Sequence, residues 1–378
     1  GTRPYIAGFV LLLGAVSTAP TWGVRPQMIS LLLASLFLLL LDRYKNKSNL
    51  YFLVPLPLIM LVWVNLHAGY FLGLVLIVIF ITGELVDLLL SGFIKREQDL
   101  PPPNLKSILA LCITLGVSIL VTLVNPNGVL IIIYPFQTLT SSSMQQFIQE
   151  WFSPDFHQLM WQPLAWLILA LIGFGMVSKK SISATNILLT VGFGYAALIS
   201  MRNIPFFALA AIPVLSDQIG SLINIHSTVA APGRLYRLMI PILLAGIFLI
   251  TCLRFIQVVQ DQPRTELENF PKTAVDWLQN NPPTGNLFNS YNWGGYLIWR
   301  LFPQVRVYID GRADVYGDAF IFDYMSIYNA EPGWESKLND QDIQTILVES
   351  NAPLADALRQ SPAWHVSFSD KLSTIFVK

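Results

Sequence analysis

Two acidic residues, Glu150 and Asp155, stand out because they lie in a polar stretch between two long apolar runs. They lie in Asn125–Gln162, the only long polar interruption before Arg254 that contains acids but neither Lys nor Arg. A carboxylate beside a hydroxyl can accept its proton and act as a general base. We therefore predict that Glu150 or Asp155 is a catalytic base. The pair could also bind a divalent metal, but two carboxylates of unknown geometry do not define such a site.

His67 is the reserve candidate for the base, in the turn Trp63–Tyr70 between two apolar runs. An imidazole titrates near neutral pH, so it suits proton transfer, and it can also form hydrogen bonds with sugars or phosphates. The alternative is an interfacial histidine that the backbone satisfies. The sequence leaves both interpretations open.

Arg25 in WGVRPQ and Arg202 in SMRNIP lie apart from the basic loops of the chain. A guanidinium pairs well with phosphate, so we predict that both bind the phosphate of a lipid-linked substrate, with Gln27 and Asn65 as polar neighbours. An arginine in an interfacial turn can instead reach lipid headgroups, and that alternative stays open.

The composition places these residues in a membrane protein. The chain has 378 residues, of which 54% are hydrophobic and 12% charged, and its mean hydropathy is +0.55. A soluble domain usually carries about 25% charged residues. The formal net charge of zero argues against a basic, nucleic-acid-binding surface. Cys112 and Cys252 lie in apolar runs, and the four histidines never fall at the spacing of a zinc site.

Nine apolar runs approach the ~20 residues needed to cross a bilayer, so residues 1–256 are predicted to form an α-helical multi-pass bundle. The predicted spans are Tyr5–Thr18, Met28–Leu41, Leu50–Val64, Phe71–Phe93, Ser107–Val124, Pro163–Ser178, Thr185–Met201, Ile204–Leu222 and Leu238–Ile256. Pro55 and Pro57 interrupt the third run, which predicts a kinked or re-entrant helix. The run VLIIIYPF is too short to span and predicts a helix along the membrane surface.

The basic loops predict the orientation of these spans, because Lys and Arg in short loops favour the cytoplasmic side. Four such loops fall on one side: Arg43–Lys47, Lys95–Lys106, Lys179–Lys180 and Arg234–Arg237. Loops 20–27, 65–70, 125–162 and 202–203, and everything after Ile256, then lie on the other side. We predict a multi-pass protein of the plasma (inner) membrane with an extracytoplasmic C-terminal domain.

Residues 257–378 are predicted to form a small soluble α/β domain, because the polar segments there alternate between strand and helix patterns. The pattern predicts helices at Lys272–Asn281, Gly294–Arg300, Ala313–Asn329 and Pro353–Gln360, and strands at Asn286–Asn289, Arg306–Ile309, Gln344–Glu349, His365–Ser369 and Thr374–Val377. The alternation indicates a largely parallel sheet.

The densest polar and aromatic motif of this domain follows its first two predicted strands. Ligands of open α/β sheets bind at the carboxyl ends of strands, so these residues are predicted to bind an acceptor or a sugar: Trp293, Tyr296, Asp310, Arg312 and Asp314. The alternative is an Asp–Arg pair that braces a turn, with Trp293 in the core.

Several segments together resemble a bacterial branch of the C-type membrane glycosyltransferases: WGVRPQ, WVNLHAGY, NPNG, EWFSPDF, RNIPFFALAAIP, NWGGYLIWRL and VYIDGR. In architecture the resemblance covers the whole chain. It implies an enzyme in contact with membrane lipid that moves a sugar from a polyprenyl-phosphate donor to a glycan or other envelope acceptor. It implies no role in binding nucleic acid.

The chain departs from this resemblance in two places. Related oligosaccharyltransferases open their soluble domain with WWDYG, whereas Tyr291–Tyr296 reads YNWGGY and lacks the acid, so binding of a peptide acceptor is not implied. These transferases usually carry a catalytic acid in the first outer loop, and Pro20–Gln27 has none. Because the chain begins with Gly1, one interpretation is an N-terminally truncated member. The others are catalysis by different acids or a non-catalytic relative.

Two further functions remain open. Glu84 and Asp87 share one face of the fourth run and could form a proton or cation site in a transporter or flippase of a lipid-linked or anionic solute. The alternative is that they face the bundle interior or the inner headgroups. No internal repeat of the spans supports that function. The chain could also be a non-catalytic membrane subunit whose outer domain binds a glycan or a partner protein.

Overall fold

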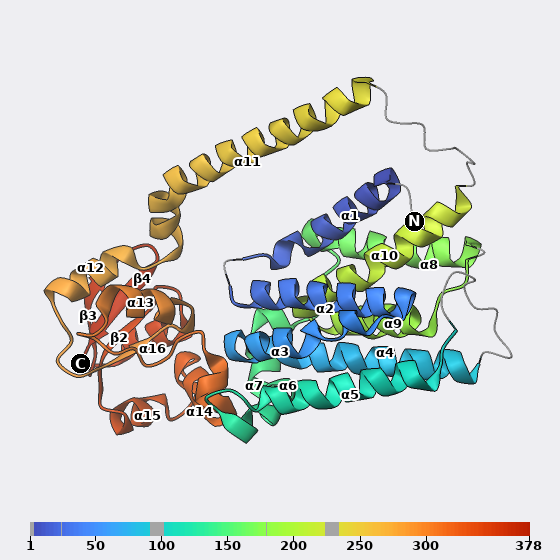
Figure 1. Cartoon of the computed structure of the whole chain (residues 1–378). Coiled ribbons are helices and arrows are strands. Elements are labelled where there is room, and N and C mark those ends of the chain that lie inside the picture. Colours follow the sequence, from blue (N-terminus) through green and yellow to red (C-terminus); the bar gives the residue numbers. More distant parts are fainter. Residues whose placement is uncertain (1–3, 24, 91–101, 179, 224–233) are drawn as a thin grey trace. The chain divides into compact units, whose positions relative to one another are not determined.

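The computed structural model describes residues 4–23, 25–90, 102–178, 180–223 and 234–378 (Figure 1). The chain separates into two compact units, residues 1–226 and residues 227–378. The predicted boundary at Ile256 falls inside one continuous helix, α11 (Arg234–Asn269), which belongs to the second unit.

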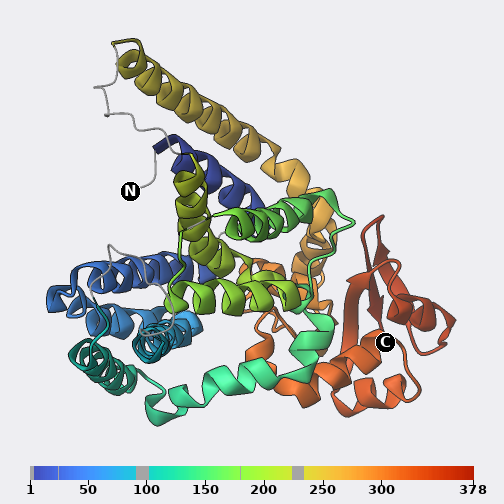
Figure 2. The same ribbon diagram turned by 90° about the vertical axis from the view of Figure 1, so that its right-hand side faces the viewer.

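The first unit is a helical bundle, seen from two sides in Figures 1 and 2. Its long helices are α1 (Pro4–Thr18), α2 (Gln27–Lys47), α3 (Pro55–Leu66), α4 (Phe71–Leu89), α5 (Leu105–Thr122), α8 (Gln162–Val177), α9 (Ala184–Ile199) and α10 (Ile204–Leu222). The most buried of them is α10, which contacts α1, α8 and α9. Two short helices, α6 (Tyr134–Thr140) and α7 (Ser142–Phe147), fill the long connection between α5 and α8.

The bundle has an exterior that suits lipid. Large apolar side chains such as Phe9 and Leu12 are exposed, whereas small polar side chains such as Ser30, Ser118 and Thr185 are buried. Hydrocarbon solvates apolar side chains, and small residues allow membrane helices to approach closely. The arrangement agrees with the prediction of a multi-pass membrane protein.

Seven helices of the described residues are long and apolar enough to cross a membrane. They match all of the nine predicted spans except the third and the seventh. Those two form shorter apolar helices, Leu50–Leu66 and Ala184–Ile199. The third is short because Pro55 begins α3 and leaves Leu50–Phe52 as a separate 3-10 turn. The predicted end of the fourth span, Phe93, and the basic loop at Lys95 lie outside the described residues. The orientation of the spans stays a prediction.

The second unit joins α11 to a four-stranded sheet. The strands are β1 (Asn286–Asn289), β2 (Ile343–Glu349), β3 (His365–Ser369) and β4 (Ser373–Val377), in the order β1-β2-β4-β3. Only β1 and β2 are parallel, because the C-terminal hairpin adds two antiparallel pairings. The prediction of a largely parallel sheet was therefore wrong, and the sheet is mixed.

Helices cover both faces of this sheet. Leu287 and Leu347 pack on one face against α12 (Lys272–Asn280) and α13 (Gly294–Leu301). Phe288 and Ile346 point to the opposite face and pack against α14 (Ala313–Tyr328), α15 (Trp334–Asp340) and α16 (Pro353–Gln360). Alternate residues of a strand face opposite ways, so β2 is apolar on both faces, as expected of a covered strand.

The predicted strand Arg306–Ile309 is not a strand. The buried side chain of Asn289 takes the place of a backbone ladder, because its Oδ1 accepts from the Tyr308 N–H at 2.8 Å and its Nδ2 donates to the Ile309 carbonyl at 2.9 Å. The segment therefore lies beside the end of β1 without joining the sheet. Gly294 allows this approach, since a Cβ there would lie 2.1 Å from the Ile309 carbonyl oxygen.

Candidate functional site

Arg25 and Glu150, far apart in the sequence, form an ion pair between Nη1 and Oε1. Arg25 comes two residues before α2, and Glu150 lies in the 3-10 turn Gln149–Trp151. Their side chains stay 58% and 36% exposed. An exposed ion pair contributes only about 0–1 kcal/mol, so either partner can exchange the other for a ligand.

Arg202 comes to the same segment from another loop. Its guanidinium lies 5.5 Å from the centre of the Trp151 ring, next to Glu150. The Ser200 hydroxyl donates to the Glu150 carbonyl at 2.9 Å, and the Met201 N–H donates to the carbonyl of Phe152 at 3.0 Å. These bonds hold the loop of Arg202 against the segment. Two predicted phosphate-binding arginines therefore flank one predicted base, and we call Arg25, Glu150, Trp151 and Arg202 the Arg25–Glu150 site.

His67 is held by the first turn of α2, the helix that Arg25 precedes. Its Nδ1 accepts from the Gly69 N–H at 3.1 Å and lies 2.6 Å from the Ser30 hydroxyl. The indole N–H of buried Trp63 donates to that hydroxyl at 2.8 Å, which leaves the hydroxyl proton for Nδ1. Neutral His67 therefore carries its proton on Nε2. A Cβ at Gly69 would lie 2.3 Å from the Ser30 Oγ, so a larger residue here would displace the hydroxyl that contacts His67. The alternative interpretation, a histidine whose ring is satisfied by the backbone, therefore applies to Nδ1. Nε2–H is the hydrogen-bond donor of the ring.

Gln27 and Asn65 brace loops. The Gln27 amide donates to the Thr21 carbonyl at 3.5 Å, and the Asn65 amide donates to the carbonyls of Leu61 and Val124, both at 2.9 Å. The two N–H groups of Asn65 are thus engaged by backbone, which argues against its predicted role in binding phosphate. The loop of Gln27 is the one that carries Arg25.

Asp155 closes a turn. Its carboxylate accepts from the His157 N–H and ring at 3.0 Å and from the Gln158 amide at 3.2 Å. The hydrogen bond from the His157 backbone, followed by that from its ring, lowers the pKa of Asp155. A carboxylate with a lowered pKa and occupied oxygens is a weak base. Glu150 is therefore the better candidate of the two.

The helical bundle contains an apolar groove of about 470 Å³. It lies between the end of α1 and the start of α8, and its lining includes Val16, Ala19, Pro20, Leu159, Met160 and Trp166. Arg25 follows Pro20 on one side, and Glu150 precedes Leu159 on the other. The groove has the size of a ligand pocket, and its apolar lining suits a lipid chain.

The predicted acceptor site in the second unit is not a cleft lined by aromatic rings. Trp293 is 3% exposed, and its indole N–H donates to the Asn269 carbonyl at 3.3 Å. Tyr296 is also buried, and its hydroxyl donates to Glu266 at 2.7 Å. Burial raises the pKa of Tyr296 to about 12. Both rings are core residues, because α13 packs this face against the sheet, and neither offers a face for stacking on a sugar.

Asp310 and Arg312 form an ion pair that braces a turn, which was the alternative to their predicted role in binding an acceptor or a sugar. Buried Asp310 accepts from Arg312 Nη2 at 2.6 Å, from Arg312 Nε at 2.8 Å and from the Tyr316 hydroxyl at 3.0 Å. The guanidinium hydrogen bonds hold the pKa of Asp310 below its ordinary value. Asp314 is exposed in the first turn of α14, where a negative charge stabilises a helix.

The structure also assembles a buried charge cluster from residues assigned to different roles by the sequence. Lys45, predicted in a basic loop, extends into the bundle, where its Nζ lies 3.2 Å from Glu84, 3.4 Å from Asp87 and 2.5 Å from the Thr185 hydroxyl. All three charged side chains are at most 13% exposed. The sequence signal was the pair Glu84 and Asp87 inside an apolar run, and it did not identify Lys45 as their partner.

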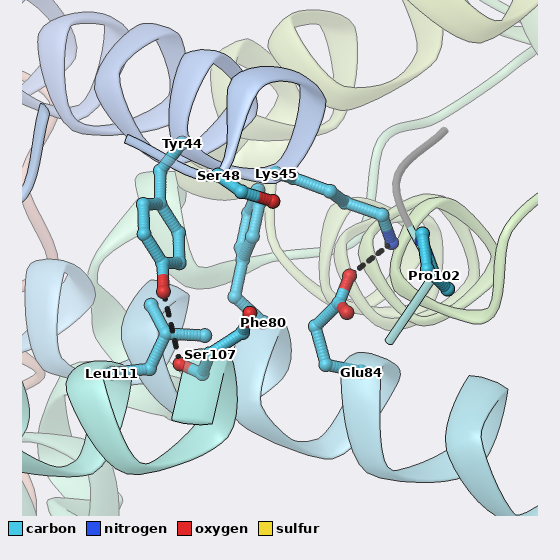
Figure 3. A pocket seen from close by; sticks show the side chains of 8 residues that line it. All are labelled: Tyr44, Lys45, Ser48, Phe80, Glu84, Pro102, Ser107 and Leu111. Atoms are coloured by element: carbon cyan, nitrogen blue, oxygen red, sulfur yellow. Dashed lines mark hydrogen bonds and ion pairs between the residues drawn. The ribbon is translucent and has the colours of Figure 1, made fainter. Parts of the chain in front are cut away.

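Figure 3 shows the neighbourhood of this cluster. Lys45 reaches toward Glu84, and the Tyr44 hydroxyl donates to the Ser107 carbonyl at 3.1 Å. The cavity between these side chains is about 10 Å³, roughly the space for one water molecule. It is too small for a solute.

Within the described ranges, no three His, Cys, Asp or Glu side chains are grouped as a metal site would require. Glu150 and Asp155 have separate partners, Arg25 and His157. The geometry thus gives no support to a divalent metal at this pair.

Comparison with known proteins assigns the chain to no family. No protein-family model matches the sequence, and no curated protein matches it significantly. The resemblance to C-type glycosyltransferases therefore stays a prediction that rests on the quoted segments.

Proposed function

We propose that the chain is a membrane glycosyltransferase that moves a sugar from a polyprenyl-phosphate donor to an acceptor at the Arg25–Glu150 site. The observation that carries the proposal is the contact between Arg25 and Glu150, with Arg202 beside the next residue. One cation for a leaving phosphate and one carboxylate for an acceptor proton are the two charges this reaction needs. Their predicted position on the extracytoplasmic face is part of the proposal.

In this mechanism the donor phosphate displaces Glu150 from Arg25. A phosphate can accept two parallel hydrogen bonds from a guanidinium, and the exposed pair is easily exchanged. The freed Glu150 carboxylate takes the proton of the acceptor hydroxyl. The hydroxyl oxygen bonds to the anomeric carbon, and the bond from that carbon to the phosphate oxygen breaks. Arg25 and Arg202 stabilise the phosphate that leaves.

The apolar groove between α1 and α8 supports a lipid-linked donor. Two of its lining residues, Pro20 and Leu159, lie five and nine residues along the chain from Arg25 and Glu150. A prenyl chain in the groove would place its phosphate near the arginines. His67, in the turn that packs on the first turn of α2, stays a candidate for binding the same phosphate or a sugar hydroxyl.

The test is a transfer assay with the purified full chain in lipid nanodiscs and a panel of synthetic polyprenyl-phosphate hexoses and pentoses. Release of polyprenyl phosphate is measured for Glu150→Gln, Arg25→Gln and Asp155→Asn. Loss of the base should lower kcat about 10²–10⁴-fold. Loss of Arg25, which binds the donor phosphate and stabilises it as it leaves, should lower kcat and raise the KM for the donor. Asp155→Asn should retain most activity because Asp155 closes a turn.

A matched control is the exposed ion pair Arg264–Glu268 on α11. Arg264→Gln and Glu268→Gln remove the same charges elsewhere and should leave transfer unchanged. Full activity of Glu150→Gln, or equal losses in the control variants, would remove the Arg25–Glu150 site from the mechanism.

The second candidate function is transport, which the buried cluster of Lys45, Glu84 and Asp87 favours. Ionisable groups inside membrane bundles often mark ion or proton pathways. Proteoliposome flux of a lipid-linked sugar that stops in Glu84→Gln but persists in Glu150→Gln, without any sugar transfer, would favour this function over the transferase.

A further inference from the structure

The second unit exposes two large aromatic side chains near its junction with α11. Trp299, in the last turn of α13, is 71% exposed, and Phe302, just after α13, is 65% exposed. Single exposed apolar residues are common, but two neighbouring large rings indicate an interaction surface. We call Trp299 and Phe302 the aromatic foot.

Polar contacts connect the aromatic foot to α11. The guanidinium of Arg300 lies 5.9 Å from the centre of the Trp299 ring and 5.7 Å from that of Tyr296. Arg300 Nη1 lies 3.5 Å from Oε1 of Glu266 on α11, and the Tyr296 hydroxyl donates to the same oxygen. Trp299 is thus held through one intervening side chain to a defined position along α11.

That position is close to the end of the apolar part of α11. This helix is long and apolar enough to cross a membrane, and its last large exposed apolar side chains before the polar part are Val258 and Val259. Seven positions, Gln260 to Glu266, follow. At 1.5 Å per residue they rise by about 10 Å, and a bend at Pro263 can only lessen that height. Figure 1 shows α11 changing direction near this end.

The short polar segment restricts what can cover the aromatic foot. The headgroup layer on each side of a bilayer is about 5–8 Å thick, so a helix held at Glu266 stays beside it. Trp and Tyr rings are enriched in this layer because it accommodates an apolar ring that carries a polar group. Soluble protein partners would have to enter the same narrow space.

We propose that Trp299 and Phe302 insert into the lipid headgroup layer and hold the α/β unit on the membrane surface. The partner is the bilayer that α11 crosses, and the contact adds a second attachment of this unit beyond α11. The proposal is independent of sugar transfer, because it rests only on α11 and α13.

The test places an environment-sensitive fluorophore on the full chain in nanodiscs. Trp299→Cys and Phe302→Cys are labelled separately in a background of Cys112→Ser and Cys252→Ser, and Val366→Cys on β3 is the control. Val366 is 48% exposed and belongs to the same unit. Lipids with nitroxide headgroups should quench the probes at 299 and 302 at least about twofold more than the probe at 366.

Either of two results would overturn the proposal. Equal lipid quenching at all three positions, with access to aqueous iodide, would mean that the aromatic foot is in water. Equal lipid quenching with protection of 299 and 302 from iodide would mean that protein covers them. Trp299 packs edge-on against buried Tyr296, with their ring centres 5.7 Å apart, so Trp299→Cys removes one contact with the core. Phe302 is 65% exposed, and if the Trp299 variant fails to fold, the probe at 302 alone decides.

Discussion

The two ends of α2 hold ion pairs of opposite character. Before its N-terminal end, Arg25 and Glu150 are 58% and 36% exposed, whereas near its C-terminal end Lys45 and Glu84 are 6% and 8% exposed. The helix between them is about 30 Å long. A buried charge must keep its partner, because an isolated one is strongly disfavoured in a medium of low dielectric. An exposed charge can change partners. The difference predicts that the buried cluster maintains the bundle, whereas the exposed pair of Arg25 and Glu150 can exchange one partner for another.

The largest effect is expected at the buried end. Lys45→Met leaves Glu84 and Asp87 without their cation, and removal of one partner from a buried pair typically costs about 3–5 kcal/mol. The change should appear as a marked loss of thermal stability in mild detergent. Lys47→Met is the control, because Lys47 is exposed and only reaches the Phe52 ring at 5.8 Å. Adding Glu84→Gln and Asp87→Asn to Lys45→Met should restore part of the stability. No restoration would mean that the charges are not the cause.

Close packing at the same end predicts the next effect. A Cβ at Gly83 would lie 2.6 Å from the Thr185 Cα and 2.7 Å from its nitrogen, and backbone atoms cannot move aside alone. Gly83→Ala should therefore lower the free energy of unfolding by about 1–3 kcal/mol. Gly116→Ala is the control, since no atom lies within 4 Å of its added Cβ. It should be neutral or slightly stabilising because Ala favours helix. Equal effects at the two glycines would contradict the packing.

Asp310 and Arg312 lie between the two extremes, because the carboxylate is 3% exposed and the guanidinium 66%. Arg312 lowers the pKa of Asp310, so the folded pKa lies below the unfolded value of about 3.9. The stabilisation is complete above the unfolded pKa and is lost as the pH falls through the folded pKa. Asp310→Asn should lower stability by about 1–3 kcal/mol at neutral pH, and this difference should shrink in acid.

Chemical unfolding of the wild type and Asp310→Asn across the acid range measures this dependence. Asp356→Asn, which affects an exposed pair with Arg359, is the matched control. It should change stability by less than about 0.5 kcal/mol. A difference for Asp310→Asn that stays constant down to the lowest pH would show that charge is not what stabilises the turn.

The smallest effect on stability is expected at the exposed end. Arg25→Gln should change the free energy of unfolding by less than about 1 kcal/mol, measured as for Lys45→Met. A change as large as that of Lys45→Met would end the comparison, because Arg25 would then be structural. A small change in stability together with a raised KM for a polyprenyl-phosphate sugar would support a role of Arg25 in binding the donor.

Local patterns predicted the elements of the chain well. The limits of β1 and α16 agree with their predicted ranges, and α3 begins at the proline that was expected to interrupt its run. These features depend on neighbouring residues, namely apolar periodicity, proline and the residues that end helices. The sequence predicted Arg25, Glu150 and Arg202 only on the same side of the membrane. It could not show which of these side chains are in contact.

The sequence by itself determined a membrane protein with apolar helices, polar connecting loops and a C-terminal α/β unit, because hydropathy and periodicity are local properties. Only the tertiary structure decided that Lys45 belongs to Glu84 and Asp87, that Asn289 replaces a strand pairing, and that Trp293 is core. Each of these depends on groups brought together from distant parts of the chain. Burial and ion pairing depend on residues that several segments bring together, so no single segment of the sequence determines them.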